Sequence, residues 1–363
     1  MSLSIAIVGL PNVGKSTLFN ALTDSNILAA NYPFATIEPN TGIVAVPDPR
    51  LAVLKDMYKT EKVIPASVTF VDIAGLVEGA SKGEGLGNQF LSHIRSCNAI
   101  CQVVRVFSDP NVVRSDSSRD PGYDIDVINT ELVLADLQTI DKRLSAFEKE
   151  ARINPKLKPL YDYALLVKAQ LNDGKPLFAS EEITGHEQKE EFSKQLQLLT
   201  MKPILYLFNV DEAMLADKVK RDELTALVAP APCVFICAKL ESELRGLDEQ
   251  DQSEMLESYG QTESGLSILS KTAYDLLGLQ SYLTAGEKEV RAWTIHKGDT
   301  APQAAGVIHG DFEKGFIAAQ IVNYDDLVSA GSEQAAKSAG KMRTEGKTYI
   351  MRDGDVVEFR FNN

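Results

Sequence analysis

Gly9-Leu-Pro-Asn-Val-Gly-Lys-Ser16 is the stretch of this sequence that decides its fold. The apolar run from Ser4 to Gly9 precedes it and predicts a buried strand, while Lys15 to Leu22 predicts a helix directly after it. A G-x₄-G-K-S stretch between a strand and a helix forms a phosphate-binding loop, because its backbone N–H groups converge on phosphate oxygens at the helix N-terminus. The stretch therefore predicts a P-loop nucleotide hydrolase.

The loop itself supplies most of the predicted phosphate contacts. Lys15 is expected to reach the β- and γ-phosphates and is the catalytic candidate, and Ser16 offers a hydroxyl to Mg²⁺. The residues expected to wrap the phosphates are Asn12, Val13, Gly14, Lys15, Ser16 and Thr17.

Two further elements of a nucleotide switch follow in chain order. The predicted strand Val68–Asp72 ends in Asp72-Ile-Ala-Gly75, where Asp72 would hold Mg²⁺ through water and the Gly75 N–H would contact the γ-phosphate. Upstream, Thr36 is the best candidate for a second Mg²⁺ hydroxyl. Thr41 is its rival, but it begins a predicted strand from 41 to 46.

Two stretches stand where GTPases carry their base-recognition motifs, but their residues differ from those motifs. Asn209-Val-Asp-Glu212 follows the predicted strand 204–208, where a GTPase carries N-K-x-D. Cys237-Ala-Lys239 follows the strand 233–237, where a GTPase carries S-A-K. Five elements in this order are typical of a switch GTPase domain and not of a kinase or a helicase.

These alterations predict that ATP is preferred to GTP. An Asp at the fourth position of N-K-x-D accepts from both guanine donors, and Glu212 is one methylene longer. Val210 replaces the Lys that packs along the base, and the amide of Asn209 could pair with adenine. The backbone N–H of Ala238 argues the other way, since this donor suits guanine O6.

The rest of the chain indicates three parts. Near-continuous apolar strands, including 99–106, indicate a mostly parallel sheet. Helical periodicity over 126–150 and 160–171, broken by Pro155 and Pro159, predicts two long antiparallel helices, with a third helix over 187–198. Strand-like runs at 290–295, 315–322 and 356–361 predict a small C-terminal α+β module.

Composition sets broader limits. The formal net charge of −14 argues against a general nucleic-acid binder, although residues 281–363 carry 10 basic and 12 acidic side chains and are nearly balanced. Neither a signal peptide nor an apolar run of membrane-spanning length is evident, so a cytoplasmic protein without a membrane partner is expected. The four cysteines, at 97, 101, 233 and 237, are expected to be core thiols, with a zinc site as the weaker alternative.

At these residues the chain resembles the YchF subfamily of Obg-related P-loop proteins, the Obg-like ATPases. The resemblance covers essentially the whole chain. Beside the phosphate loop it includes Asn31-Tyr-Pro-Phe34, Asp72-Ile-Ala-Gly-Leu-Val77, Gly83-Glu-Gly-Leu-Gly87, Asn129-Thr-Glu-Leu132, Tyr282-Leu-Thr-Ala-Gly286, Glu289-Val-Arg-Ala-Trp-Thr294 and His309-Gly-Asp-Phe-Glu-Lys-Gly315.

The resemblance implies an α/β fold in which a Ras-like P-loop NTPase domain carries an inserted helical hairpin and a C-terminal β-grasp (TGS) domain. The expected boundaries are 1–124 with 201–280, then 125–200, then 281–363. It also implies ATP as the preferred nucleotide, binding to the large ribosomal subunit with rRNA as a candidate contact, and a link to oxidative stress. The alternative is a stress-response ATPase that acts through protein partners.

Three positions bear on the chemistry. Leu76 stands where Ras-like enzymes carry a water-orienting Gln, which predicts slow intrinsic turnover. Arg114 stands where bacterial relatives often carry a His proposed to assist hydrolysis. Asn12 occupies the position that ligates K⁺ in some relatives, and a loop-shaping Asn is an equal alternative.

Overall fold

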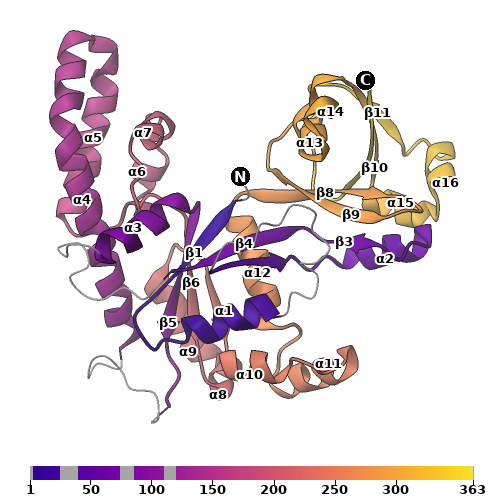
Figure 1. The fold of residues 1–363 in the computed structure, drawn as a ribbon, viewed down its shortest axis with the longest axis horizontal. Coiled ribbons are helices and arrows are strands. Elements are labelled where there is room, and N and C mark those ends of the chain that lie inside the picture. Colours follow the sequence, from indigo (N-terminus) through magenta and orange to yellow (C-terminus); the bar gives the residue numbers. More distant parts are fainter. Residues whose placement is uncertain (1–2, 25–39, 74–85, 110–119, 363) are drawn as a thin grey trace. The chain divides into compact units, whose positions relative to one another are not determined.

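The computed structural model describes residues 3–24, 40–73, 86–109 and 120–362 (Figure 1). The chain divides into two compact units, each described here by itself. Of the described residues, the first contains 3–24, 40–43, 69–73, 86–109 and 120–272, and the second contains 44–68 and 273–362. Residues 44–68, which the predicted boundaries place in the nucleotide domain, thus cluster with the C-terminal residues.

The first unit is built on a six-stranded sheet with the order β2-β4-β1-β5-β6-β7. Its strands are β1 (Ser4–Val8), β2 (Thr41–Ala45), β4 (Ser67–Asp72), β5 (Ala99–Arg105), β6 (Ile204–Asn209) and β7 (Cys233–Ile236). β1 pairs in parallel with β4 and β5, and β6 pairs in parallel with β5 and β7. Every residue of β5 and of β6 is buried, as expected where helices cover a parallel sheet. The predicted parallel α/β core is confirmed.

Helices follow the strands of this unit along the chain (Figure 1). They are α1 (Lys15–Asp24), α3 (Leu86–Ser96), α4 (Pro121–Ile153), α5 (Lys158–Asn172), α6 (Glu181–Thr184), α7 (Lys189–Gln195), α8 (Glu212–Ala216), α9 (Lys218–Val228), α10 (Ala238–Glu243), α11 (Glu249–Ser258) and α12 (Gly265–Leu276).

The long helix α4 begins earlier than predicted because Asp120 caps it. The Asp120 side chain accepts from the Gly122 N–H, 2.9 Å away, and Pro121 supplies the fixed φ that suits a first helical position. Pro155 opens the short 3₁₀ turn between α4 and α5, as expected of a helix breaker. Pro159 was predicted to break the helix but lies in the first turn of α5, where its missing N–H costs nothing.

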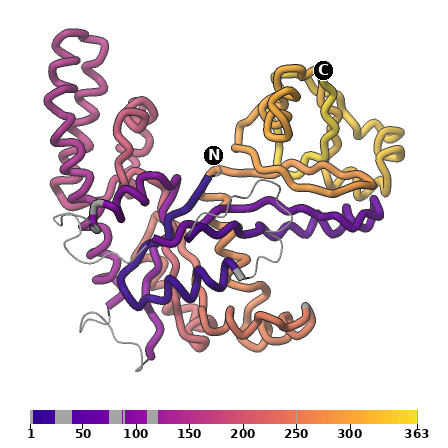
Figure 2. The backbone as a smooth tube through the Cα atoms, in the orientation of Figure 1, coloured from indigo at the N-terminus to yellow at the C-terminus, as the bar shows by residue number. Residues whose placement is uncertain are grey.

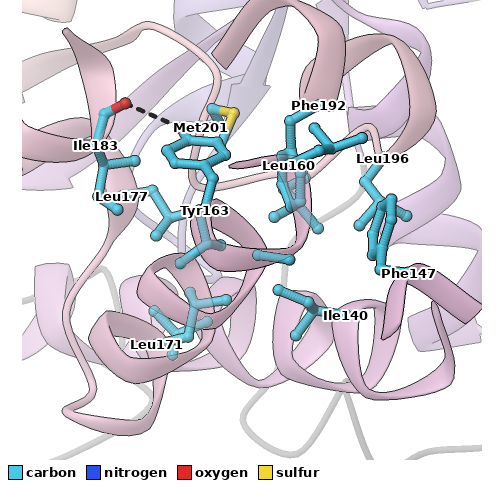
Figure 3. Packing of buried hydrophobic residues seen from close by; sticks show 14 residues of the cluster. Ile140, Phe147, Leu160, Tyr163, Leu171, Leu177, Ile183, Phe192, Leu196 and Met201 are labelled. Atoms are coloured by element: carbon cyan, nitrogen blue, oxygen red, sulfur yellow. Dashed lines mark hydrogen bonds between the residues drawn. The ribbon is translucent and has the colours of Figure 1, made fainter. Parts of the chain in front are cut away.

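A buried cluster joins α4 and α5 to the smaller helices beside them (Figure 3). The rings of Phe147 and Tyr163 lie 5.8 Å and 5.1 Å from that of Phe192. The Tyr163 hydroxyl donates to the Ile183 carbonyl, 2.9 Å away, so the buried O–H is satisfied. These contacts give the helical segment a hydrophobic core of its own.

The predicted helix over 187–198 is wrong in extent, because α7 ends at Gln195. The buried carboxylate of Asp136 explains why the chain leaves the helix. It accepts from the backbone N–H groups of Leu199 and Thr200, each 2.8 Å away, and from the Thr200 hydroxyl. These bonds hold the segment in a non-helical conformation just before β6 begins.

The second unit contains a six-stranded sheet with the order β11-β10-β12-β8-β9-β3. Its strands are β3 (Val63–Ile64), β8 (Leu279–Ala285), β9 (Val290–His296), β10 (Phe316–Asn323), β11 (Arg343–Glu345) and β12 (Asp355–Phe361). Its helices are α2 (Pro49–Tyr58), α13 (Ala301–Ile308), α14 (Gly310–Lys314), α15 (Tyr324–Ala330) and α16 (Glu333–Ser338). The three C-terminal strands predicted from the sequence are confirmed as β9, β10 and β12.

Along the chain, α2 and β3 lie between β2 and β4, and Figure 2 shows the course of this segment in indigo and purple. β3 pairs in parallel with β9, which makes it an edge strand of the second sheet. Arg50 of α2 forms ion pairs with Asp48 at 2.8 Å and with Asp353 at 2.7 Å. The second ion pair links the helix to the turn before β12. A two-residue strand carries too little pattern to be predicted from sequence.

Candidate nucleotide-binding site

The loop between β1 and α1 has the backbone that a phosphate cradle requires. Asn12 and Gly14 adopt positive φ values of 62° and 98°. A Cβ on Gly14 would lie 2.3 Å from Nδ2 of Asn209, so the position also needs glycine for space. The sequence therefore places glycine where the loop turns and where it meets the end of β6.

Lys15 is the buried cation of this loop. Its side chain is folded back so that Nζ donates to the carbonyl oxygens of Gly9 at 2.9 Å and Leu10 at 2.7 Å. The residue is only 8% exposed, and burial lowers the pKa of its ammonium group to about 8, against the opposing effect of Asp72. An ammonium group held by two carbonyl oxygens can exchange these partners for phosphate oxygens.

Asp72 lies beside this cation because β4 runs parallel to β1. The register aligns Ile7 with Asp72, so the carboxyl end of β4 meets the start of the loop. Burial raises the pKa of the Asp72 carboxyl, and the positive charge of Lys15 opposes that shift. The two predicted groups are thus close enough to interact electrostatically.

Ser16 and Thr17 stand in the first turn of α1, and both are exposed. Their hydroxyls are therefore accessible to a ligand at the helix N-terminus. Within the described parts of the chain, no group of three or more His, Cys, Asp or Glu residues could hold a metal unaided. A phosphate-bound Mg²⁺ needs no such group, because phosphates and water supply most of its ligands; one hydroxyl and one carboxylate, as in Ser16 and Asp72, fit it.

Asn209, at the end of β6, connects the two loops of the site. Its Nδ2 donates to the Val13 carbonyl at 3.0 Å, and its Oδ1 accepts from the Ala238 N–H at 3.3 Å. The residue is 5% exposed. One amide hydrogen and one lone pair stay uncommitted by these bonds. Asn209 therefore positions the phosphate loop, whatever further contact it makes with a base.

The other base-side residues are arranged differently from the sequence expectation. Val210 is 1% exposed, so protein atoms enclose the side chain that was expected to lie where a Lys packs along the base. Glu212 accepts from Nζ of Lys239 at 2.9 Å, and this hydrogen bond lowers the pKa of its carboxyl. The carboxylate is thus engaged by the lysine of the Cys-Ala-Lys stretch.

Arg105 is a functional candidate that the sequence reasoning missed. It ends β5, is 5% exposed, and lies with its guanidinium 4.4 Å from the ring centre of Phe107. Its Nη1 donates to the Asn12 carbonyl at 3.5 Å. The sequence does distinguish this residue, because Arg105 is the only charged residue in the apolar strand that begins at Ala99.

Four of the predicted positions lie outside the described residues: Thr36, Gly75, Leu76 and Arg114. Among the cysteines, Cys97, Cys101 and Cys237 are buried, and Cys233 is partly exposed. No helix in the described ranges is long and apolar enough to cross a membrane.

Comparison with known families divides the chain into two matched regions. Residues 4–157 match the profile described as a 50S ribosome-binding GTPase. Residues 279–362 match the profile YchF-GTPase_C, which is described as a protein of unknown function.

Similarity to individual proteins extends over the whole chain. The chain is 50% identical to the Ribosome-binding ATPase YchF of Bacillus subtilis and 48% identical to that of Escherichia coli O157:H7, and covers 100% of both sequences in each case. Among solved structures, it resembles the Schizosaccharomyces pombe YchF GTPase with a TM-score of 0.88 and 38% identity, over 99% of this chain and 98% of the other.

Proposed function

The chain belongs to the YchF family of P-loop nucleotide hydrolases, and from this premise we propose that it hydrolyses ATP in preference to GTP with Mg²⁺ and acts as a slow switch on the ribosome. The observation that carries the hydrolase assignment is the parallel register of β1 and β4, which brings the Asp72 carboxyl within electrostatic range of the Lys15 cation at the phosphate loop. A cation at the start of α1 and a carboxylate at the end of β4 suit a ligand that brings both phosphate and a divalent cation.

We assign each residue a role that suits its chemistry. The N–H groups from Asn12 to Thr17 would bind phosphate oxygens, and Lys15 would stabilise charge that develops on them during transfer. Ser16 and Asp72 would hold Mg²⁺, joined by Thr36, and the Gly75 N–H would contact the γ-phosphate. Bound Mg²⁺ would supply additional positive charge at the phosphates. A K⁺ ion beside Asn12 would also add positive charge there.

The preference for ATP rests on Glu212 and Lys239. A guanine-reading carboxylate must be free to accept from two donors at once. The Glu212 carboxylate is longer than that of Asp and already accepts from Lys239, so part of its accepting capacity is used. The names of the relatives differ on this point, since the two bacterial proteins are called ATPases and the fission-yeast protein a GTPase.

The ribosomal partner is carried over from the names of the relatives. We propose the large subunit as the partner, rRNA as the contact and the cytoplasm as the location. We propose the three-part division at 1–124 with 201–280, 125–200 and 281–363, in which α4 and α5 form an inserted hairpin and the C-terminal part is a TGS domain of β-grasp type. Residues 44–68 are the exception, because they cluster with the C-terminal residues. The sheet β11-β10-β12-β8-β9 with helix α13 packed beside it supports the last assignment.

Co-sedimentation of the purified full chain with isolated 30S and 50S subunits tests this proposal, with ATP, ADP or no nucleotide. We expect binding to 50S that depends on the nucleotide. Removal of residues after 278 is a poor substitute, because β3 pairs with β9 and would lose its partner. Equal binding to both subunits, or none, would refute the ribosomal part and leave ATP hydrolysis to be judged separately.

A further inference from the structure

The second sheet separates between β8 and β12. These strands run parallel but share a single register pair, Val356 with Leu283. By contrast, β8 and β9 stay paired from Leu279 to Ala285, and β12 follows β10 along its whole length apart from one irregularity. β8 and β12 therefore diverge in the middle of the sheet while each keeps its outer partner.

The hydrogen bonds around β12 show which backbone groups face this gap. Just before β12, Gly354 serves both neighbours: its carbonyl accepts from Tyr324 N–H and its N–H donates to the Ser281 carbonyl of β8. Just after β12, Asn362 N–H donates to the Gly315 carbonyl, so the even-numbered residues within β12 point their backbone groups toward β10. The odd-numbered residues point theirs toward β8. After Val356 no register pair follows, so the N–H and C=O of Phe359 have no strand opposite them among the described residues.

The facing edge of β8 is open in the same way. Gly286 N–H donates to the Glu289 carbonyl across the β8–β9 turn. The adjacent residue, Ala285, therefore directs its N–H and C=O away from β9 and toward β12. Two unpaired edges thus face one another, as an extended chain would require if it were to bind between them or along one of them.

A cleft of about 1080 Å³ lies at this separation. It is lined by Ala285 and Phe359 from the diverging strands and by residues of α16. Ile308 of α13 and Phe312 of α14 also line it, and both pack against the buried core of the second unit. The cleft thus combines open backbone with apolar side chains that would accept alternate side chains of a strand.

The charged side chains that line the cleft are mostly acidic. Glu287, Glu333 and Glu358 contribute three carboxylates, and Lys337 is the one cation among the lining residues. The excess of negative charge favours a partner segment that carries lysine or arginine and disfavours an acidic one.

We propose that the cleft between β8 and β12 binds an extended segment of a partner protein in which basic and apolar residues alternate. The segment adds its backbone to the Phe359 edge of β12, its apolar side chains face Ile308 and Phe312, and its basic side chains face Glu358 and its acidic neighbours. The cleft is formed by residues of the second unit, and the proposal does not depend on which nucleotide is hydrolysed.

The probes that test this are two eight-residue peptides, one with alternating lysine and valine and one with glutamate in place of lysine. Binding to the full chain is followed in amide-resolved NMR spectra. We expect the lysine peptide to shift the amide signals of Ala285 and Phe359 and to slow exchange of the Phe359 amide. Glu358→Lys should weaken its binding about fivefold.

Glu345→Lys is the matched control, because Glu345 lies on β11 outside the cleft lining. It should leave the affinity within about twofold of the natural protein. The proposal fails if the two peptides bind equally, if the lysine peptide does not bind, if the shifted amides lie elsewhere, or if Glu345→Lys weakens binding as much as Glu358→Lys does.

Discussion

Nδ2 of Asn209 donates to the carbonyl oxygen of Val13 at a distance of 3.0 Å, which ties the end of β6 to the centre of the phosphate loop. Because Oδ1 of the same amide accepts from Ala238, one side chain fixes both the phosphate loop and the loop after β7. Asn209, which was expected to contact the base, thus also links the phosphate loop to the loop after β7.

Asn209→Ala should weaken ATP and GTP binding by similar factors. The variant leaves the Val13 carbonyl and the Ala238 N–H without their partner, at a cost of about 1–3 kcal/mol, or roughly five- to 150-fold in affinity. Titration with both nucleotides measures the two factors. A loss confined to ATP would show that base reading is the main role of this amide.

Asn98→Ala controls for general effects on β1, since Asn98 also bonds the backbone of that strand, accepting from the Ser4 N–H at 3.0 Å. Ser4 begins β1, at the end of the strand away from the phosphate loop. This variant should bind both nucleotides as the natural protein does.

Glu212→Asp should shift selectivity toward GTP. The shorter carboxylate withdraws from Lys239 and takes the form that accepts from both guanine donors, so the ratio of GTP to ATP affinity should rise about tenfold or more. Glu243→Asp is the matched control, because Glu243 also lies near Lys239, at 3.9 Å, but outside the N-x-x-E position. An unchanged ratio in Glu212→Asp would place specificity elsewhere.

Lys15 should take up a proton when Mg-ATP binds under alkaline conditions. Its pKa of about 8 in the nucleotide-free protein should rise beside the negative phosphates, so at pH 8.5 binding should draw in roughly three quarters of a proton. Calorimetry in two buffers of different ionisation enthalpy measures this uptake. It should nearly vanish at pH 6.5, and no uptake at pH 8.5 would mean that Lys15 is not the group that meets the phosphates.

Glu241 should make the stability of the first unit depend on pH. Its Oε1 accepts from the Gly265 N–H at 2.6 Å, and burial raises the pKa of its carboxyl to about 7, against the effect of the backbone hydrogen bonds. Between the unfolded pKa of about 4.5 and pH 7 the folded state holds a proton that the unfolded state has lost. The free energy of unfolding therefore falls as pH rises through that window and levels off above it.

Glu241→Gln removes this titration. Denaturant unfolding followed by circular dichroism at pH 4.5 and 7.5 should show a loss in the natural protein that exceeds the loss in the variant by up to ~3 kcal/mol. Asp136, whose carboxyl pKa burial raises to about 6, titrates in both proteins and cancels in the comparison. Parallel pH profiles would contradict the assignment.

The residues of the proposed phosphate side could be named from the sequence because they are contiguous or end a strand with a strong apolar pattern. To assign roles to Lys15 and Asp72, only the order of strand, loop and helix along the chain was needed. The base side depends on bonds between distant segments, and no local pattern reveals that Asn209 reaches Val13 or that Lys239 reaches Glu212.

The same distinction applies to the fold. The parallel strands and the two long helices follow from periodicity in their own residues. The end of α7 depends on Asp136, which lies more than sixty residues earlier in the chain and binds Leu199. β3 becomes a strand only because β9 provides its partner.

The most direct test of the central claim is phosphate release from ATP by the purified full chain, measured with Mg²⁺ and with Mg²⁺ chelated, beside the same assay with GTP. We expect slow, Mg²⁺-dependent release, below ~1 s⁻¹ because Leu76 cannot orient water, and faster with ATP than with GTP. Lys15→Ala and Ser16→Ala should each reduce release to background while the circular dichroism spectrum is unchanged. Release that persists in either variant, or that is faster with GTP, would contradict the account.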